Sequence, residues 1–149
     1  MDRAGLNFGR GFVRLSAENG KGGMSKKRVM VVEDSQVIYQ MVQEALEAKG
    51  YDVFVVTNGF EALRDLGEIQ PDLIVTDIMM PKLDGLRLCE AIQNRLETKN
   101  IPFIFISSKF DQRTVERGRA IGAKYFIAKP FEMETLVTCV GKVLNLNTE

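Results

Sequence analysis

The segment that most constrains the fold of this chain is residues 72–85, DLIVTDIMMPKLDG. It starts with a run of apolar residues, Leu73, Ile74 and Val75, reaches an acid at Asp77, and ends in a loop that contains proline and glycine. A short run of branched apolar residues between turn signals is typical of a strand covered on both faces, as in a parallel sheet. Asp77 then lies at the carboxyl end of that strand, the edge where open parallel sheets bind their ligands.

The rest of the chain repeats this alternation of strand and helix. Apolar runs predict further strands at residues 28–32, 52–56, 102–107 and 124–128. Apolar residues at helical spacing predict helices at residues 35–50, 60–66, 85–96, 111–120 and 132–146. Five strands that alternate with five helices predict one right-handed, doubly wound α/β sheet.

The helical spacing also predicts which side chains are buried. It places Val37 and Met41 on the apolar face of the first helix, for which Ser35 is the expected N-cap. It places Leu96 on the buried side of the helix that begins at Gly85.

The length of 149 residues is that of one ordinary domain, but the first residues do not look like part of it. Residues 1–25 contain six of the thirteen glycines and have no sustained apolar period. We therefore expect a disordered extension at residues 1–25, with Met24 as an alternative start, and a folded domain at residues 26–149.

Composition excludes several classes of function. Twenty basic and twenty acidic residues cancel, so no net charge attracts the chain to nucleic acid or to an anionic membrane. The chain has no histidine, which removes the usual base of serine and cysteine hydrolases and the usual transition-metal ligand. Cys89 and Cys139 fit neither a disulfide framework nor a zinc site, and no apolar run has the length of a membrane span or signal sequence. These features predict a cytoplasmic protein with reduced cysteines.

Polar residues follow four of the predicted strands. They are Glu33 and Asp34, Asp77, Ser107 and Lys129. Three carboxylates at one edge repel one another, because two charges ~4 Å apart at an effective dielectric constant of ~20 cost about 4 kcal/mol. A Mg²⁺ ion and the lysine offset that repulsion, and together with a hydroxyl they suit a carboxylate that accepts a phosphoryl group.

With this ordered set of residues, and with the Lys-Pro-Phe turn at 129–131, the chain resembles the receiver domain of two-component response regulators. The resemblance covers residues 27–146 and is to the single-domain, chemotaxis-regulator type. It implies a flavodoxin-like sheet of five parallel strands in the order 2-1-3-4-5 with five helices.

The resemblance also implies a role for each site residue. Asp77 is the expected phosphoryl acceptor, and Mg²⁺ is the expected cofactor. The expected metal ligands are Asp34, Asp77 and the backbone carbonyl of Met79, with Glu33 acting through a water. Lys129 is expected to pair with the phosphoryl oxygens, and its peptide bond to Pro130 is expected to be cis.

Switching is expected to involve Ser107 and Phe126. Ser107 donates its hydroxyl to the phosphoryl group and moves toward it in the active state. Phe126 is the aromatic partner of that movement and stands where the family often has tyrosine. Met79 and Lys109 flank the mouth of the site, where we expect them to influence the rate of dephosphorylation.

The expected phosphoryl donor is a sensor histidine kinase or phosphotransfer protein, acting in trans. The expected output is a downstream protein or a homodimer, through the face formed by residues 111–120, 124–128 and 132–146. No direct nucleic-acid or membrane partner is expected, and the chain is not expected to be an enzyme beyond its own phosphotransfer and dephosphorylation. Two alternatives remain open: a scaffold that works without phosphorylation, and a small magnesium-dependent phosphohydrolase.

Overall fold

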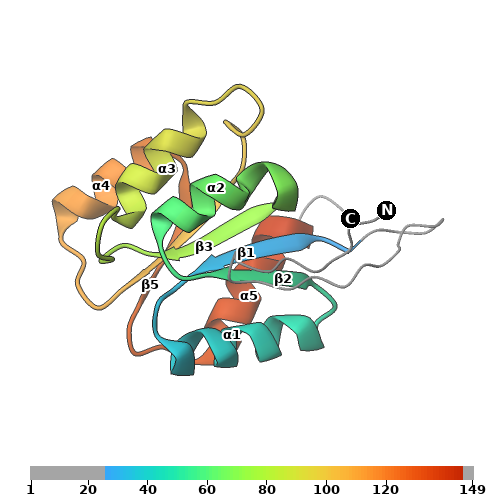
Figure 1. Ribbon diagram of the computed structural model, residues 1–149. Helices are drawn as coiled ribbons and strands as arrows, with labels where there is room; N and C mark the ends of the chain where they lie inside the picture. The colour runs from blue at the N-terminus through green and yellow to red at the C-terminus, as the bar shows by residue number, and fades with distance from the viewer. Residues whose placement is uncertain (1–25, 146–149) are drawn as a thin grey trace.

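The computed structural model describes residues 26–145, and within them strands and helices alternate as the sequence predicts (Figure 1). The strands are β1 (Arg28–Val32), β2 (Asp52–Val56), β3 (Leu73–Asp77), β4 (Phe103–Ser107) and β5 (Ala123–Ala128). The helices are α1 (Gln36–Ala48), α2 (Gly59–Ile69), α3 (Gly85–Gln93), α4 (Gln112–Ala120) and α5 (Met133–Asn145). The predicted extension at residues 1–25 and the predicted end of α5 at residue 146 lie outside the described residues.

Local sequence explains where the helices begin. Four helices start after a polar residue whose side-chain oxygen accepts a backbone N–H of the first turn, which satisfies a donor that has no partner inside the helix. These residues are Ser35, Asn58, Asp84 and Asp111. The cap at Ser35 was expected from the sequence, and the structure confirms it.

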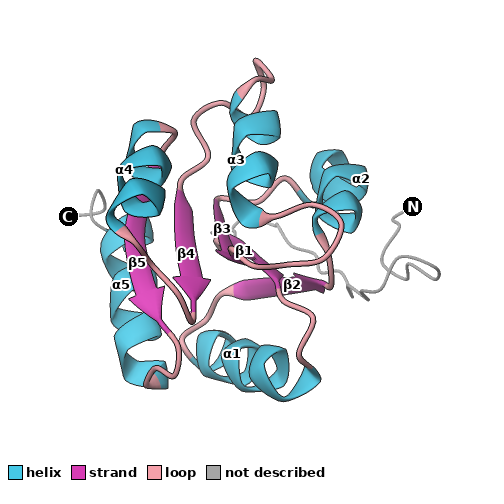
Figure 2. Cartoon of the chain, turned by 90° about the vertical axis from the view of Figure 1, so that its left-hand side faces the viewer, coloured by secondary structure: helices cyan, strands magenta, loops and turns pink. Residues whose placement is uncertain are grey.

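All neighbouring strands of the sheet are parallel, in the order β2-β1-β3-β4-β5, which confirms the predicted topology. The register pairs Val32 with Thr76, Asp77 with Ile106, and Ser107 with Ala128. The strands therefore end nearly level with one another, and the residues just beyond them meet at one edge of the sheet. Helices α1 and α5 cover one face of the sheet, and α2, α3 and α4 cover the other (Figures 1 and 2).

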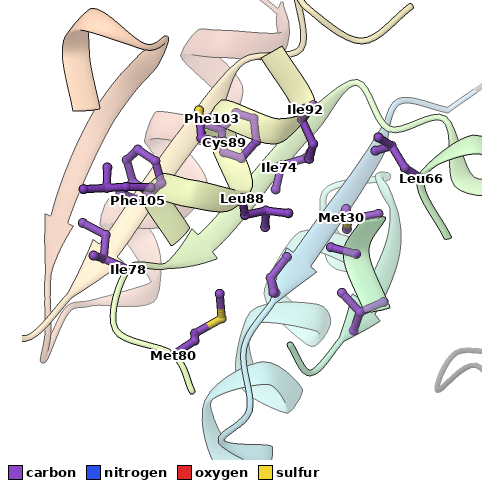
Figure 3. Packing of buried hydrophobic residues seen from close by; sticks show 14 of the residues in the cluster. Met30, Leu66, Ile74, Ile78, Met80, Leu88, Cys89, Ile92, Phe103 and Phe105 are labelled. Carbon is purple, nitrogen blue, oxygen red and sulfur yellow. The ribbon is translucent and has the colours of Figure 1, made fainter. Parts of the chain in front are cut away.

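The sheet separates two hydrophobic clusters. Successive strand residues point to opposite faces, so in β1 Met30 packs toward α2 and α3 while Val29 packs toward α1 and α5. Figure 3 shows the first cluster, in which Phe103 and Phe105 of β4 lie beside the residues of α3. Burying each large side chain of this kind stabilises the fold by roughly 1.5–3 kcal/mol, so the two clusters hold helices α1, α2, α3 and α5 on the sheet.

The predicted burial of Leu96 is wrong. Helix α3 ends at Gln93, and the Leu96 side chain is 80% exposed. The helix stops because the hydroxyl of Thr98 donates to the carbonyl of Ile92 at 2.7 Å, as does the N–H of Arg95 at 3.2 Å. These bonds take a carbonyl that a longer helix would use itself, and Leu96 is left on the outside of the turn.

Val37 and Met41 are likewise exposed, by 69% and 48%, although the spacing predicted them to be buried. The buried stripe of α1 consists of Val42 and Leu46, with Ile38 partly buried beside them. Val37 and Met41 are four residues apart and so form a second stripe, which faces away from the sheet. The apolar surface of α1 is therefore wider than the sheet covers.

The two cysteines are free, as expected, but they differ in environment. Cys89 in α3 is fully buried, and this burial raises the pKa of its thiol to about 12. Cys139 in α5 is only partly buried, although desolvation raises its thiol pKa as well.

Thiol labelling of the native chain is therefore expected to modify Cys139 first, with Cys89 reacting at least ~100-fold more slowly because the thiolate is the reactive form. Intact mass spectrometry after maleimide treatment, with and without urea, measures the number of labelled thiols. In Cys139→Ser the fast label should disappear. Rapid labelling of that variant under native conditions would contradict the buried position of Cys89.

No helix among residues 26–145 is both long enough and apolar enough to cross a lipid bilayer.

Candidate functional site

The candidate site lies at the carboxyl edge of the sheet, where the level strand ends deliver polar residues. Glu33 follows β1, Asp77 is the last residue of β3, Ser107 is the last residue of β4, and Lys129 follows β5. The predicted residues thus come from four strands to one edge, although Glu33 and Lys129 are 96 positions apart in the chain. A sheet of this order places its ligand crevice at the same edge.

Lys129 joins two of the carboxylates. Its Nζ lies 2.6 Å from Oδ2 of Asp77 and 3.2 Å from Oε1 of Glu33, and both carboxylates are almost completely buried. Burial disfavours the charge of Lys129, but the hydrogen bonds and charges of Asp77 and Glu33 outweigh it and raise the lysine pKa above its ordinary value. Lys129 is therefore firmly protonated between the two acids. The Lys129–Pro130 peptide is cis, as expected.

Backbone donors fix the other carboxylate oxygens. The N–H of Met79 donates to Oδ1 of Asp77 at 3.0 Å, and the N–H of Ser35 donates to Oε2 of Glu33 at 3.0 Å. Burial raises the pKa of Glu33, and the nearby charge of Asp77 acts in the same direction, while Ser35 and Lys129 oppose both. Asp77 is thus held in one orientation, with Oδ1 toward the following loop and Oδ2 toward Lys129.

The expected convergence of three carboxylates is not found among the described residues, which hold no cluster of three acidic, histidine or cysteine side chains arranged for a metal ion. Glu33 and Asp77 meet at Lys129, whereas Asp34 lies one residue further along the chain and is exposed. The donors at this edge are nevertheless carboxylate and carbonyl oxygens. That set fits Mg²⁺, which takes one or two carboxylates and fills its other positions with waters or phosphate oxygens.

Ser107 is completely buried, and its hydroxyl bonds to the loop that follows β4. The hydroxyl donates to the carbonyl of Lys109 at 3.0 Å and accepts from the N–H of Lys109 at 3.2 Å. The carbonyl of Ser107 in turn accepts the N–H of Lys129 at 2.9 Å. Ser107 therefore sits beside the lysine, with its hydroxyl engaged by the loop. Moving that hydroxyl toward Asp77 requires both bonds to Lys109 to break.

Phe126 is a partly buried residue of β5, and its ring packs against the cluster on the α2–α4 side of the sheet. Met79 is exposed in the loop after Asp77, next to the site. Phe126 thus packs beneath the carboxyl edge of the sheet, and Met79 lies at its surface.

Two features of the site were not predicted from the sequence. A side chain at Gly85 would collide with the backbone oxygen of Asp77, so α3 begins directly against the end of β3. An open, mainly apolar pocket of about 370 Å³ also adjoins Lys129. It is lined by Ile38, Met41, Ser108, Lys129, Pro130, Phe131 and Met133. The exposed apolar stripe of α1 was a signal for this pocket, but the α1 pattern was interpreted as a single buried face.

Comparison with protein families matches residues 29–141 to the response regulator receiver domain. The chain belongs to the response regulator receiver family. As a member, it functions in two-component signalling, and the predicted resemblance is confirmed.

Relatives with known roles differ in how much of their length this receiver domain covers. It is 36% identical over 113 residues to protein PilG of Pseudomonas aeruginosa, covering 76% of this chain and 84% of PilG. It is 32% identical over 117 residues to sensory transduction protein BceR of Halalkalibacterium halodurans, covering 78% of this chain but 49% of BceR. The receiver domain therefore spans most of PilG and about half the length of BceR.

Among solved structures, this receiver domain is similar to the chemotaxis protein CheY4 of Vibrio cholerae. The two have 31% sequence identity and a TM-score of 0.76, and the match covers 80% of this chain and 100% of the CheY4 chain. This likeness agrees with the flavodoxin-like fold and with the expected similarity to chemotaxis-type single receivers.

Proposed function

We propose that this receiver domain is a signalling switch that accepts a phosphoryl group on Asp77 from a histidine kinase or phosphotransfer protein. The observation that carries the proposal is the position of the Asp77 carboxylate. It lies at the end of a central strand, held by the N–H of Met79 through one oxygen and by Lys129 through the other. A carboxylate fixed in this way is oriented for attack, and the adjacent ammonium stabilises the charge of an arriving phosphoryl group.

In the proposed reaction, a carboxylate oxygen of Asp77 attacks the phosphorus atom of the donor. The new O–P bond makes an acyl phosphate while the P–N bond of a phosphohistidine breaks, and the freed imidazole nitrogen takes up a proton. Lys129 remains beside the oxygens of the transferred group. Ser107 leaves Lys109 and donates its hydroxyl to the same group.

Magnesium is part of the proposal. Asp34, Asp77 and the carbonyl of Met79 would hold the ion, with Glu33 contributing through a water. When bound, Mg²⁺ neutralises negative charge on the phosphoryl oxygens. Lys129 supplies one positive charge to two buried carboxylates. A dianionic phosphoryl group adds further negative charge, which a bound cation would neutralise.

The proposal assigns two separate surfaces to partners. A phosphoryl donor reaches Asp77 over the rim of the carboxyl edge, where the exposed side chains of Met41 and Met79 and the pocket beside Lys129 offer apolar contact. The output is proposed to pass through α4, β5 and α5, either to a downstream protein or to a second copy of the chain. A cytoplasmic location, in keeping with the free cysteines, completes the proposal.

The test is phosphorylation of the native chain by acetyl phosphate. With Mg²⁺ present, intact mass is expected to increase by one phosphoryl group, and with excess chelator the increase should be lost. Hydroxylamine should release the group and leave a hydroxamate that tandem mass spectrometry locates at Asp77, because acyl phosphates react in this way. A chemical donor is used so that the result does not depend on finding the cognate kinase.

Three outcomes contradict the proposal in different ways. A folded chain that gains no phosphoryl group supports a scaffold function. Continued release of phosphate from varied esters, many times per protein molecule, supports a phosphohydrolase. A hydroxamate at a residue other than Asp77 overturns the assignment of the acceptor.

A further inference from the structure

Gly118 occupies an unusual position in α4. It is the one buried residue among those of the helix, whose apolar stripe is otherwise thin. A Cβ atom at this position would lie 2.7 Å from Cζ and 2.9 Å from Cε2 of the Phe126 ring, closer than real Cβ contacts allow. The ring of Phe126 therefore fills the space that any other residue at position 118 would need.

The Phe126 ring is partly buried and packs against two other rings. The ring of Phe105 lies on one side at a centroid distance of 5.8 Å, and the ring of Phe110 meets it edge-on at 5.5 Å and 89°. The guanidinium of Arg119 lies 6.0 Å from the ring centroid. Adding a methyl group at Gly118 must therefore either expel the ring from this position or push α4 away from β5.

The position of the ring is connected to the phosphorylation site by a short path. Phe110, which closes the ring position, is the residue after Lys109, and Lys109 holds the hydroxyl of Ser107 through its backbone N–H and carbonyl. Phe126 is also paired in the sheet with Phe105, two residues before Ser107. Release of the Ser107 hydroxyl frees the backbone segment that keeps Phe110 against the ring.

We propose that Gly118 is a positioning residue of the switch, which seats the Phe126 ring between α4 and β4 and thereby ties the position of α4 to the hydrogen bonds of Ser107. The connection to signalling rests on the proposed function of Asp77. The packing of the Phe126 ring is supported separately, by its contacts with Gly118, Phe105 and Phe110.

Helix propensity provides a contrast that makes the proposal testable. Glycine inside a helix is less favourable than alanine, so Gly118→Ala would strengthen α4 if the helix were merely a solvated surface element. If Gly118 seats the ring, the same substitution weakens the attachment of α4 instead. The two explanations predict opposite signs.

The experiment is amide hydrogen exchange of α4 in the full chain, compared with α1 as an internal reference. Gly118→Ala is expected to accelerate exchange in α4 by about tenfold, as overpacking of a closed contact does. In the background of Phe126→Leu, where the ring is gone, the same substitution should slow exchange. Gly67→Ala is the matched control, because Gly67 lies in α2 with no atom within 4 Å of its Cβ position, and it should leave α4 unchanged.

A second variant tests the connection to the site without any phosphorylation. Ser107→Ala removes both bonds to Lys109, so it is expected to accelerate α4 exchange and to make Gly118→Ala less effective in combination. Two results would contradict the packing of Phe126 against Gly118: slower amide exchange of α4 in Gly118→Ala, or an equal change in α4 exchange with and without the Phe126 ring. Independent effects of Ser107→Ala and Gly118→Ala overturn the connection.

Phosphorylation is measured separately on the same variants. Gly118→Ala is expected to increase the initial rate of phosphorylation by acetyl phosphate several-fold, since it destabilises the arrangement in which Lys109 holds Ser107. An unchanged rate in a variant whose α4 exchange is accelerated overturns the role in switching. Failure of the native chain to accept a phosphoryl group would instead contradict the proposed function, while the exchange results would still decide whether Gly118 seats the ring.

Discussion

Asp77→Asn is expected to abolish phosphorylation by acetyl phosphate while leaving the chain folded. The amide lacks the charge and the nucleophilic oxygen of the carboxylate, but its carbonyl oxygen still accepts the N–H of Met79. Lys129 keeps its bond to Glu33, and the repulsion between Glu33 and the charge of Asp77 disappears. Intact mass after incubation with acetyl phosphate and Mg²⁺ measures the result, and a urea melt checks the fold.

Asp72→Asn is the matched control for this prediction. Asp72 precedes β3 at the opposite edge of the sheet, where its Oδ2 accepts the N–H of Arg28 at 2.8 Å, a bond that asparagine also accepts. The control undergoes the same chemical change at the other end of β3 and should accept a phosphoryl group at the native rate. If Asp77→Asn still gained a group that hydroxylamine releases, another carboxylate would be the acceptor.

Gly85→Ala is expected to lower the free energy of unfolding by about 2–3 kcal/mol and to slow phosphorylation at least ~10-fold. Its Cβ would collide with the backbone oxygen of Asp77 and lie 3.0 Å from Cα of Ile78. These are backbone atoms, so no side-chain rotation relieves the contact. The end of β3 or the start of α3 must shift, and either movement displaces the Asp77 carboxylate. Urea melts and the rate of mass gain measure the two effects.

Gly67→Ala provides a control of opposite sign. Gly67 is exposed in the last turn of α2, and its Cβ position is empty to 4 Å, so alanine should raise the free energy of unfolding by about 0.5 kcal/mol. The phosphorylation rate should not change. A Gly85→Ala protein as stable as the native chain would show that α3 adjusts to the added methyl group without moving β3.

The fold was predictable because each strand is a short apolar run that can be recognised from the local sequence. Strands β3 and β4 are buried throughout and β1 is buried after Arg28, as in a sheet covered on both faces, and the connections between parallel strands are right-handed by general rule. Where prediction was wrong, tertiary contacts decided. The bond between Thr98 and Ile92 ended α3 before Leu96, and no periodicity in the sequence encodes such a bond.

The edge of the sheet at which the candidate residues meet was predictable, but the geometry among them was less so. Strand ends identified Asp77, Ser107 and Lys129, because the carboxyl edge of a parallel sheet collects them. The sharing of Lys129 between two acids, the exposure of Asp34 and the attachment of Ser107 to Lys109 depend on side-chain directions beyond the strands. The close packing against Gly85 and Gly118 could not be predicted, because a glycine in the sequence does not show which atoms lie where its side chain would be.

The division of the core by the sheet has a consequence for engineering. Phe105 and Phe126 belong to one cluster, while Val42 of α1 and Leu136 of α5 belong to the other. Changes in unfolding free energy add when two sites share no partners. Stabilising substitutions among the buried residues of α1, which lies outside the proposed output face, should therefore compensate destabilising ones near Phe126 without altering the balance of the switch. Helix α1 is thus the place to stabilise the chain when variants of α4, β5 and α5 are compared.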